Sequence, residues 1–447
     1  MSTMSPPVPP GVTQGRSATA RLAWLDALRG FAALVVVLFH LSPIAIGDHY
    51  HSVMGRHFDM GKFGVLLFFL VSGYVIPMSL ERHGSPRKFW VGRLFRIYPA
   101  YLASIAVFFA LTLAGVVEVP ASLRQETVAG TLGHVPMLQE FVGVRGVVRP
   151  FWTLSFEMVF YLIVVGLFVW GLHRYSALWA AGLMLTAALA GPALPRDLFG
   201  ATAADRRLLA AVLVVAVAAS ILAYVTGRRR LVLPAAVLGL CFVALPLFNG
   251  HSTRWGTANS SWQATFMLAV MFAGTVIYRA QYGQLSRKLA IPVLALVAVG
   301  VALTTWLSVG GKYELIKWCT TAVAVVVSFA IAFALRHRRV PAVLVWLGAV
   351  SYSLYLLHVM VLHAIAEILP EGVLDHVPGR FAVSAAFLII ALIAAWLSYR
   401  FVEQPGQRLG RRVQRYLDAR LGPETWSRPA AVPAAAGEAP EPVRAAS

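Results

Sequence analysis

The sequence predicts an all-α fold, a polytopic integral membrane helical bundle of ten to twelve transmembrane helices. Of its 447 residues 59% are hydrophobic and 13% charged, more apolar surface than a water-soluble chain of this size can bury in one core. Apolar runs of about 20 residues, enough to cross ~30 Å of hydrocarbon, recur along the chain. The 38 lysines and arginines lie mostly between these runs, which indicates membrane topology and not nucleic-acid binding.

Twelve apolar runs are candidate spans. They begin near Trp24, Lys62, Pro99, Phe151, Ser176, Leu208, Leu231, Trp262, Leu289, Leu315, Pro341 and Gly379. Pro192 and Pro234 shorten or break two of them, and a re-entrant or merged pair would lower the number to ten or eleven. The first run lacks the cleavage site of a signal peptide and is predicted to be a retained span. Cys241 and Cys319 lie inside apolar runs and predict neither a disulfide nor a metal site.

The loops predict the orientation of the bundle. With the amino terminus in the cytoplasm and the loops alternating, the cytoplasmic segments are almost purely basic, and Glu81 is the acid among them. The opposite loops mix both signs. We therefore expect both termini in the cytoplasm and a multi-pass protein of the cell membrane. Residues 1–23 are predicted to be a disordered cytoplasmic segment, 24–407 the membrane domain, and 408–447 a basic helix followed by a disordered tail.

The first span contains three ionisable residues, Asp26, Arg29 and His40. Eleven residues make three helical turns and about 20°, so Arg29 and His40 share a helix face about 16 Å apart. Asp26 and Arg29 could form an interfacial ion pair, and His40 could be a hydrogen-bonded interior side chain. A functional role for His40 is favoured because imidazole can accept and return a proton near neutral pH.

Two other spans carry polar groups at a similar predicted depth. Glu157 lies about 9 Å below the outer surface if the fourth span begins at Phe151. Ser351, Tyr355 and His358 are spaced i, i+4, i+7 and form one polar face of the penultimate span. Because His40, Glu157 and His358 all fall in the outer half of the membrane, we expect one shared cavity; separate hydrogen bonds between packed helices are the alternative.

The second and third spans supply further candidates near the cytoplasm. Ser72 and Gly73 allow close helix packing in the second span. Arg93 and Arg96 lie one turn apart at the cytoplasmic surface, where they suit a polyanionic ligand such as a set of phosphates. The positive-inside rule would also place basic residues there.

Six motifs, taken together and in this order, resemble the acyltransferase type 3 family of membrane acyltransferases. They are Leu25 to Gly30 with His40, the run Phe68 to Gly73, Arg93 to Pro99, Trp152 to Glu157 with Phe160 and Tyr161, Ser351 to His358, and Arg400 to Pro405. The resemblance covers residues 24–407, the predicted membrane acyltransferase domain.

The resemblance implies transfer of an acyl group, commonly acetyl, from acyl-CoA to a hydroxyl of a carbohydrate or a secreted metabolite, without a metal. The family's essential arginine and histidine correspond to Arg29 and His40, and its acid to Glu157. We expect Arg93 and Arg96 to bind the CoA phosphates. The candidate acceptor-binding residues are Ser72, Trp152, Ser155, Tyr355 and His358.

Two mechanisms follow for His40. It acts as a general base on the acceptor hydroxyl, with Glu157 orienting its ring, or it carries the acyl group transiently. The main alternative function is a transporter or flippase, which should show two repeated halves. The His40, Glu157 and His358 motifs each occur once, and a sensor without catalysis is a third possibility.

Overall fold

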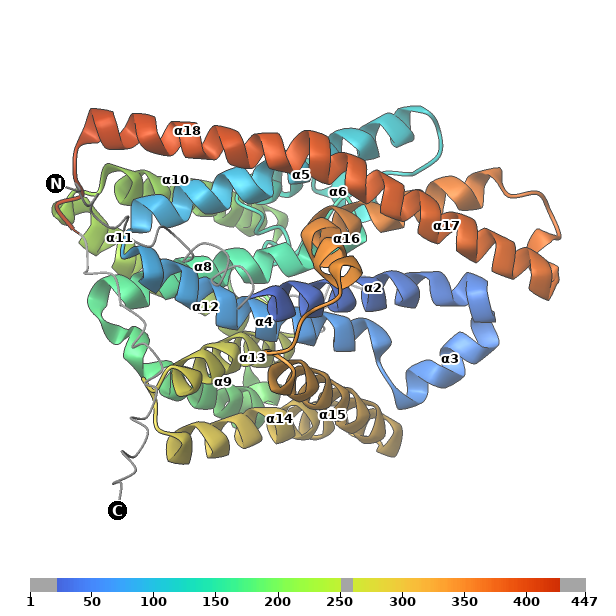
Figure 1. Ribbon diagram of the computed structural model, residues 1–447, viewed down its shortest axis with the longest axis horizontal. Coiled ribbons are helices and arrows are strands. Elements are labelled where there is room, and N and C mark those ends of the chain that lie inside the picture. The colour runs from blue at the N-terminus through green and yellow to red at the C-terminus, as the bar shows by residue number, and fades with distance from the viewer. Residues whose placement is uncertain (1–21, 251–259, 427–447) are drawn as a thin grey trace, which may run out of the picture.

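The computed structural model describes residues 22–250 and 260–426, which form helices and connecting turns without a strand (Figure 1). Twelve helical segments in these ranges are long and apolar enough to cross a membrane. Each coincides with one of the predicted runs, so the prediction of a polytopic helical membrane bundle is confirmed. The disorder predicted for residues 1–21 and 427–447 lies outside the described residues.

The twelve candidate spans follow the chain in order. They are α2 (Ala23–Ile46), α4 (Met60–His83), α5 (Pro86–Leu113), η1 with α8 (Arg149–Phe151, Trp152–Trp170), η2, α9 and η3 (Leu172–Tyr175, Ser176–Ala190, Gly191–Ala193), α10 (Ala203–Thr226), α11 with α12 (Arg229–Cys241, Ala244–Phe248), α13 (Ser261–Gln281), α14 (Arg287–Val309), α15 (Lys312–Ala334), α16 (Ala342–Ile368), and α17, η5 and α18 (Val377–Ser398, Tyr399–Glu403, Gln404–Leu421). The shorter helices are α3 (Asp48–His57), α6 (Ala121–Gln125), α7 (Thr127–His134) and η4 (Val373–Asp375).

Close backbone contacts at glycines hold the central helices together. A Cβ on Gly30 of α2 would lie 2.6 Å from the backbone nitrogen of Gly348 on α16. A Cβ on Gly73 of α4 would lie 1.7 Å from the carbonyl oxygen of Met271 on α13. Small residues at such crossings let two helices approach closely within a membrane. Since α2 and α16 run in the same direction from this crossing, residues at equal distances along them become neighbours.

The connection between α5 and α8 folds into the protein instead of lying on its surface. Leu138, Phe141 and Val142 are each 0% exposed. His134 is also buried: its Nδ1 lies 2.7 Å from the Gly130 carbonyl oxygen, and its Nε2 accepts a hydrogen bond from the Val147 amide at 3.1 Å. Burial lowers the pKa of His134, which favours the neutral ring, and this ring links Gly130 to Val147. As a result α8 begins beneath the surface of the protein.

The last span is one continuous helix of 45 residues, about 68 Å long at 1.5 Å per residue (Figure 1). Proline lacks the amide proton that continues an α-helix, yet the helix runs through Pro405. A π-helical turn, Tyr399–Glu403, precedes the proline, and the Gln404 amide donates to the Tyr399 carbonyl. This wider turn carries the helix past Pro405.

The carboxyl-terminal helix α18 packs along α5. Gly406 and Gly410 of α18 lie against Pro99 and Phe95 of α5. Arg87, 1% exposed, closes the predicted cytoplasmic end by donating to Asp418 and to the carbonyl groups of Gly422, Val225 and Thr226. α18 therefore fixes the position of α5, which carries Arg93 and Arg96.

Candidate active site

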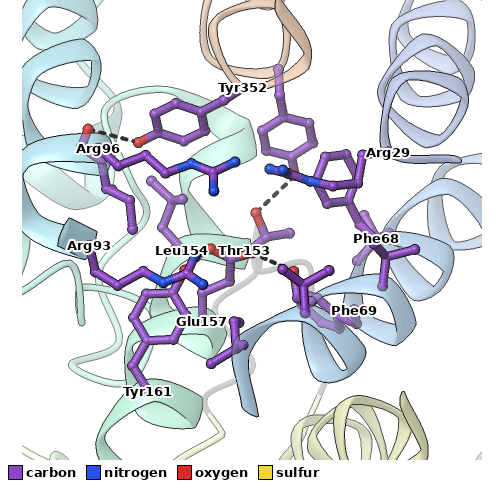
Figure 2. Close-up of a pocket in the computed structure, with 17 residues that line it drawn as sticks. Arg29, Phe68, Phe69, Arg93, Arg96, Thr153, Leu154, Glu157, Tyr161 and Tyr352 are labelled. Carbon is purple, nitrogen blue, oxygen red and sulfur yellow. Dashed lines mark hydrogen bonds between the residues drawn. The ribbon is translucent and has the colours of Figure 1, made fainter. Parts of the chain in front are cut away.

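A narrow cavity between α2, α4, α5, α8 and α16 collects three arginines. We call it the arginine pocket; it is lined by Arg29, Arg93, Arg96, Glu157, Tyr161 and Tyr352, among apolar side chains. Figure 2 shows the three guanidinium groups pointing into the same space around Thr153 and Glu157. The pocket encloses about 50 Å³.

The charges of the arginine pocket do not cancel. Glu157 accepts hydrogen bonds from Ser72 at 2.9 Å and from Tyr161 at 2.8 Å. Arg93 lies over the Tyr161 ring, 5.4 Å from its centroid. Within residues 22–250 and 260–426 none of the three arginines forms an ion pair, so the considered pair of Asp26 with Arg29 is absent there. Three positive charges and one negative leave +2, which suits an anionic group.

His40 and His358 lie side by side on α2 and α16. His40 Nδ1 lies 2.9 Å from the Val36 carbonyl oxygen and 3.4 Å from His358 Nε2. His358 Nδ1 lies 3.0 Å from the Leu354 carbonyl oxygen. Because a carbonyl only accepts, we assign the proton of each neutral ring to Nδ1. His40 Nε2 then keeps a free lone pair, with no hydrogen-bond partner in the described part of the chain, and can accept a proton.

Two larger cavities meet at His40. The first, which we call the histidine pocket, is about 250 Å³ and is lined by His40, Asp59, Lys62, Arg149, Trp152 and Tyr355. The second, which we call the vestibule, is about 550 Å³ and is lined by His40, His51, Arg145, Arg149, Met360 and His363 among others. Tyr355 lines both the arginine pocket and the histidine pocket. The three cavities thus follow one another, with Tyr355 and His40 at the two junctions.

Glu157 does not lie where the sequence predicts. It was expected beside His40 to orient the imidazole, but its carboxylate is bonded to Ser72 and Tyr161 in the arginine pocket, and His40 pairs with His358. The predicted depth was counted from the start of α8. Trp152, at the start of α8, already lines the histidine pocket with His40, and Glu157 lies five residues further along α8, about 7.5 Å along the helix axis. The expected cavity shared by His40, Glu157 and His358 is therefore wrong: His40 and His358 meet through a hydrogen bond between packed helices, His358 lines none of the three cavities, and Glu157 lines the arginine pocket.

Ser155, a candidate substrate-binding residue, does not reach these cavities. It is 0% exposed and lines neither the arginine pocket nor the cavities around His40. Two residues make about 200° on a helix, so Ser155 faces away from Thr153 and Glu157. Thr153, which the candidate residues omitted, donates to the Tyr355 hydroxyl at 3.1 Å. The spacing Thr153, Glu157, Tyr161 marks the cavity face of α8 and could have identified it.

Of the other candidate substrate-binding residues, His358 is buried and lines none of the three cavities, whereas the remaining three do. Ser72 and Tyr355 line the arginine pocket, and Trp152 lines the histidine pocket. Lys62 was missed: its Nζ lies 4.5 Å from the centroid of the Trp152 ring, and it lines the histidine pocket with His40. Its position near the start of the second span gave a signal, since ionisable residues inside membrane spans are costly and usually functional.

The chain matches one protein family over most of its length and is similar to several bacterial proteins. The family described as "Acyltransferase domain" matches residues 22–201 and 208–400. O-acetyltransferase OatA of Staphylococcus aureus is 22% identical over 428 residues, 90% of this chain and 60% of the relative. Exopolysaccharide production protein ExoZ of Rhizobium meliloti is 35% identical over 133 residues, 28% of this chain and 42% of the relative. Acyltransferase MdmB of Streptomyces mycarofaciens is 33% identical over 154 residues, 32% of this chain and 38% of the relative. The chain thus spans about 60% of the OatA length, and no solved structure matches it.

Proposed function

The chain belongs to the acyltransferase domain family, and we propose that it is a cell-membrane enzyme that transfers an acyl group, most simply acetyl, from acyl-CoA to a hydroxyl of a carbohydrate or a secreted metabolite. The single observation that carries the proposal is the free Nε2 lone pair of His40 at the junction of two cavities. The names of the relatives, an O-acetyltransferase and an exopolysaccharide production protein, support the reaction and the class of acceptor.

The donor is assigned to the arginine pocket. Arg29, Arg93 and Arg96 supply an excess of positive charge for CoA phosphates, and Glu157 spaces them through its bonds to Ser72 and Tyr161. The ~16 Å rise along α2 between Arg29 and His40 suits an extended arm that passes Tyr355.

The chemical step uses His40 as a base. Nε2 takes the proton of the acceptor hydroxyl while the oxygen attacks the thioester carbonyl, and collapse of the tetrahedral intermediate breaks the carbon–sulfur bond. The CoA thiolate then recovers the proton from the imidazolium. His358 positions the base through its bond to Nδ1, and the Tyr355 hydroxyl binds the carbonyl oxygen. In the covalent variant Nε2 attacks the thioester first and passes the acyl group to the acceptor.

The test is acetyl transfer by the purified protein in liposomes. Radiolabelled acetyl-CoA is supplied with a panel of glycans and hydroxylated metabolites, and free CoA and labelled product are both measured. Acceptor-dependent CoA release with label in the acceptor supports the proposal. A labelled protein that forms without acceptor and is then discharged by it selects the covalent variant. Folded protein that neither binds nor turns over any acyl-CoA would contradict the proposal and favour a transporter.

A further inference from the structure

Resting on the proposed function, we propose that the vestibule selects acceptors that carry a carboxylate or a phosphate, and that Arg145 and Arg149 bind this anionic group. The acceptor hydroxyl is thereby presented to His40. The relevant features are the charge of the vestibule, the position of its arginines and the rigidity of the wall that carries them.

The vestibule has an excess of positive charge. Its charged lining residues are Glu118, Arg124, Arg145 and Arg149, so with neutral histidines three positive charges and one negative give +2. Glu118 and Arg124 form an exposed ion pair at 3.6 Å and offset each other. The excess therefore resides on Arg145 and Arg149, which form no ion pair among the residues that the structure describes.

Arg145 has unused hydrogen-bonding capacity. Its Nε is buried without a hydrogen-bond partner, and burial lowers the pKa of its guanidinium group. A buried donor left unsatisfied costs free energy, and an anionic ligand would satisfy both the donor and the charge.

Arg149 links anion binding to the reaction. It lines the vestibule and the histidine pocket, and His40 lines the same two cavities. An acceptor whose charge lies at Arg149 therefore has its neighbouring hydroxyl groups close to His40 Nε2. The vestibule encloses about 550 Å³, within the size range of small-ligand sites, whereas the arginine pocket encloses about 50 Å³.

The wall that carries the two arginines is held in place before ligand binding. Gln139 donates to the Phe151 carbonyl at 3.1 Å, and His134 accepts from the Val147 amide at 3.1 Å. These bonds flank Arg145 and Arg149 in the chain. A site on such a wall loses little entropy when it binds an anion.

The test measures binding of matched fluorescent sugars to the full-length protein in liposomes without acetyl-CoA. The probes are 4-methylumbelliferyl glucuronide, the corresponding glucoside, and the glucoside 6-phosphate, which differ in the group on C6. We expect at least one charged probe to bind about tenfold or more tightly than the neutral one, with a preference that falls as salt increases. The two charged probes separate carboxylate from phosphate selection.

Matched substitutions identify the residues. Arg145→Gln and Arg149→Gln should each lower the affinity for the preferred charged probe about tenfold and leave the affinity for the neutral probe unchanged. Arg206→Gln is the control, since Arg206 lies at the same predicted outer end but donates to the Gly200 carbonyl and does not line the vestibule. Equal affinity for charged and neutral probes, including no measurable binding of any probe, would overturn the inference. An equal effect of the control substitution would overturn it as well.

Failure of this inference is distinguishable from failure of the transferase. Acetyl transfer to the same sugars is measured in parallel. Charge-selective binding without transfer would contradict the enzymatic role and leave anion selection supported. Transfer to the neutral sugar with the same KM as to both charged sugars would support the enzyme and refute anion selection.

Discussion

Replacing Arg93 by glutamine should weaken the binding of acetyl-CoA, and only through the loss of a contact to the CoA phosphates. Arg93 lies in the arginine pocket over the Tyr161 ring, and it forms no ion pair within the described residues. The charge that lines the pocket falls from +2 to +1 when Arg93 is lost. Arg93→Lys keeps the charge but not the planar group that lies over the ring, so we expect it to be intermediate.

The magnitude follows from the interaction that is lost. A hydrogen bond to a charged group contributes about 1.5–3 kcal/mol, and each 1.4 kcal/mol is about tenfold in affinity. Arg93→Gln should therefore raise the KM for acetyl-CoA roughly 10-fold to 100-fold. The kcat should change little, because Arg93 does not line the cavities around His40.

The assay compares two donors. Acetyl-CoA carries the phosphates, whereas acetyl-pantetheine carries the same thioester and arm without them, and free thiol release is measured for both. We expect Arg93→Gln to impair use of acetyl-CoA and to leave acetyl-pantetheine unaffected. Arg82→Gln is the control, because Arg82 lies exposed near the end of α4 and this substitution removes an equal charge.

Two outcomes would refute this reasoning. An equal loss with both donors would show that Arg93 acts on the fold or on the chemical step. An unchanged KM for acetyl-CoA would show that the phosphates bind elsewhere.

Three further substitutions test the account. His358→Ala should lower kcat on the order of tenfold to a hundredfold at unchanged donor KM in steady-state assays, because Nδ1 of His40 keeps the Val36 carbonyl but loses the side-chain partner that fixes the ring against α16; a raised KM would contradict this. Gly73→Ala should destabilise the protein by about 1–3 kcal/mol in thermal unfolding, since its Cβ would lie 1.7 Å from an α13 carbonyl oxygen, whereas Gly92→Ala, with nothing within 4 Å, should not. Burial raises the pKa of Glu424, so its contribution is present at acidic pH and lost as the pH rises through the raised pKa. The protection factors of residues 404–426, which correct exchange rates for the intrinsic effect of pH, should fall over that range, and Glu424→Gln should remove this fall.

The sequence predicts the spans from the length of the apolar runs, and the similar depth of His40 and His358 from distance along a helix. His40 and His358 lie at similar distances from the starts of α2 and α16, which run in the same direction from their crossing at Gly30. Depth counting therefore places them at one level, and the close crossing of α2 with α16 at Gly30 brings them into contact. Long apolar runs likewise identify all twelve candidate spans.

Depth counting fails where a helix does not begin at the membrane surface. The connection before α8 is buried, so Glu157 lies in the arginine pocket and not beside His40. A residue can also belong to a family motif without pointing into the cavity: Ser155 lies within the run Trp152 to Glu157 but faces away from the cavities. Arg149 lines the histidine pocket because the connection before α8 folds back into the protein. The path of this connection cannot be predicted from the local sequence.

In the proposed reaction His40 performs the proton transfer. The most direct measurement is the rate of acceptor-dependent acetyl transfer in liposomes for wild type, His40→Ala and His83→Ala, with folding checked by thermal unfolding. His83 is the matched control, since it is exposed and its ring bonds only to the Ser79 carbonyl within the described residues. The account predicts normal transfer for His83→Ala and a loss of at least about a hundredfold for His40→Ala. Normal turnover by folded His40→Ala protein would contradict both the base and the acyl-carrier mechanisms.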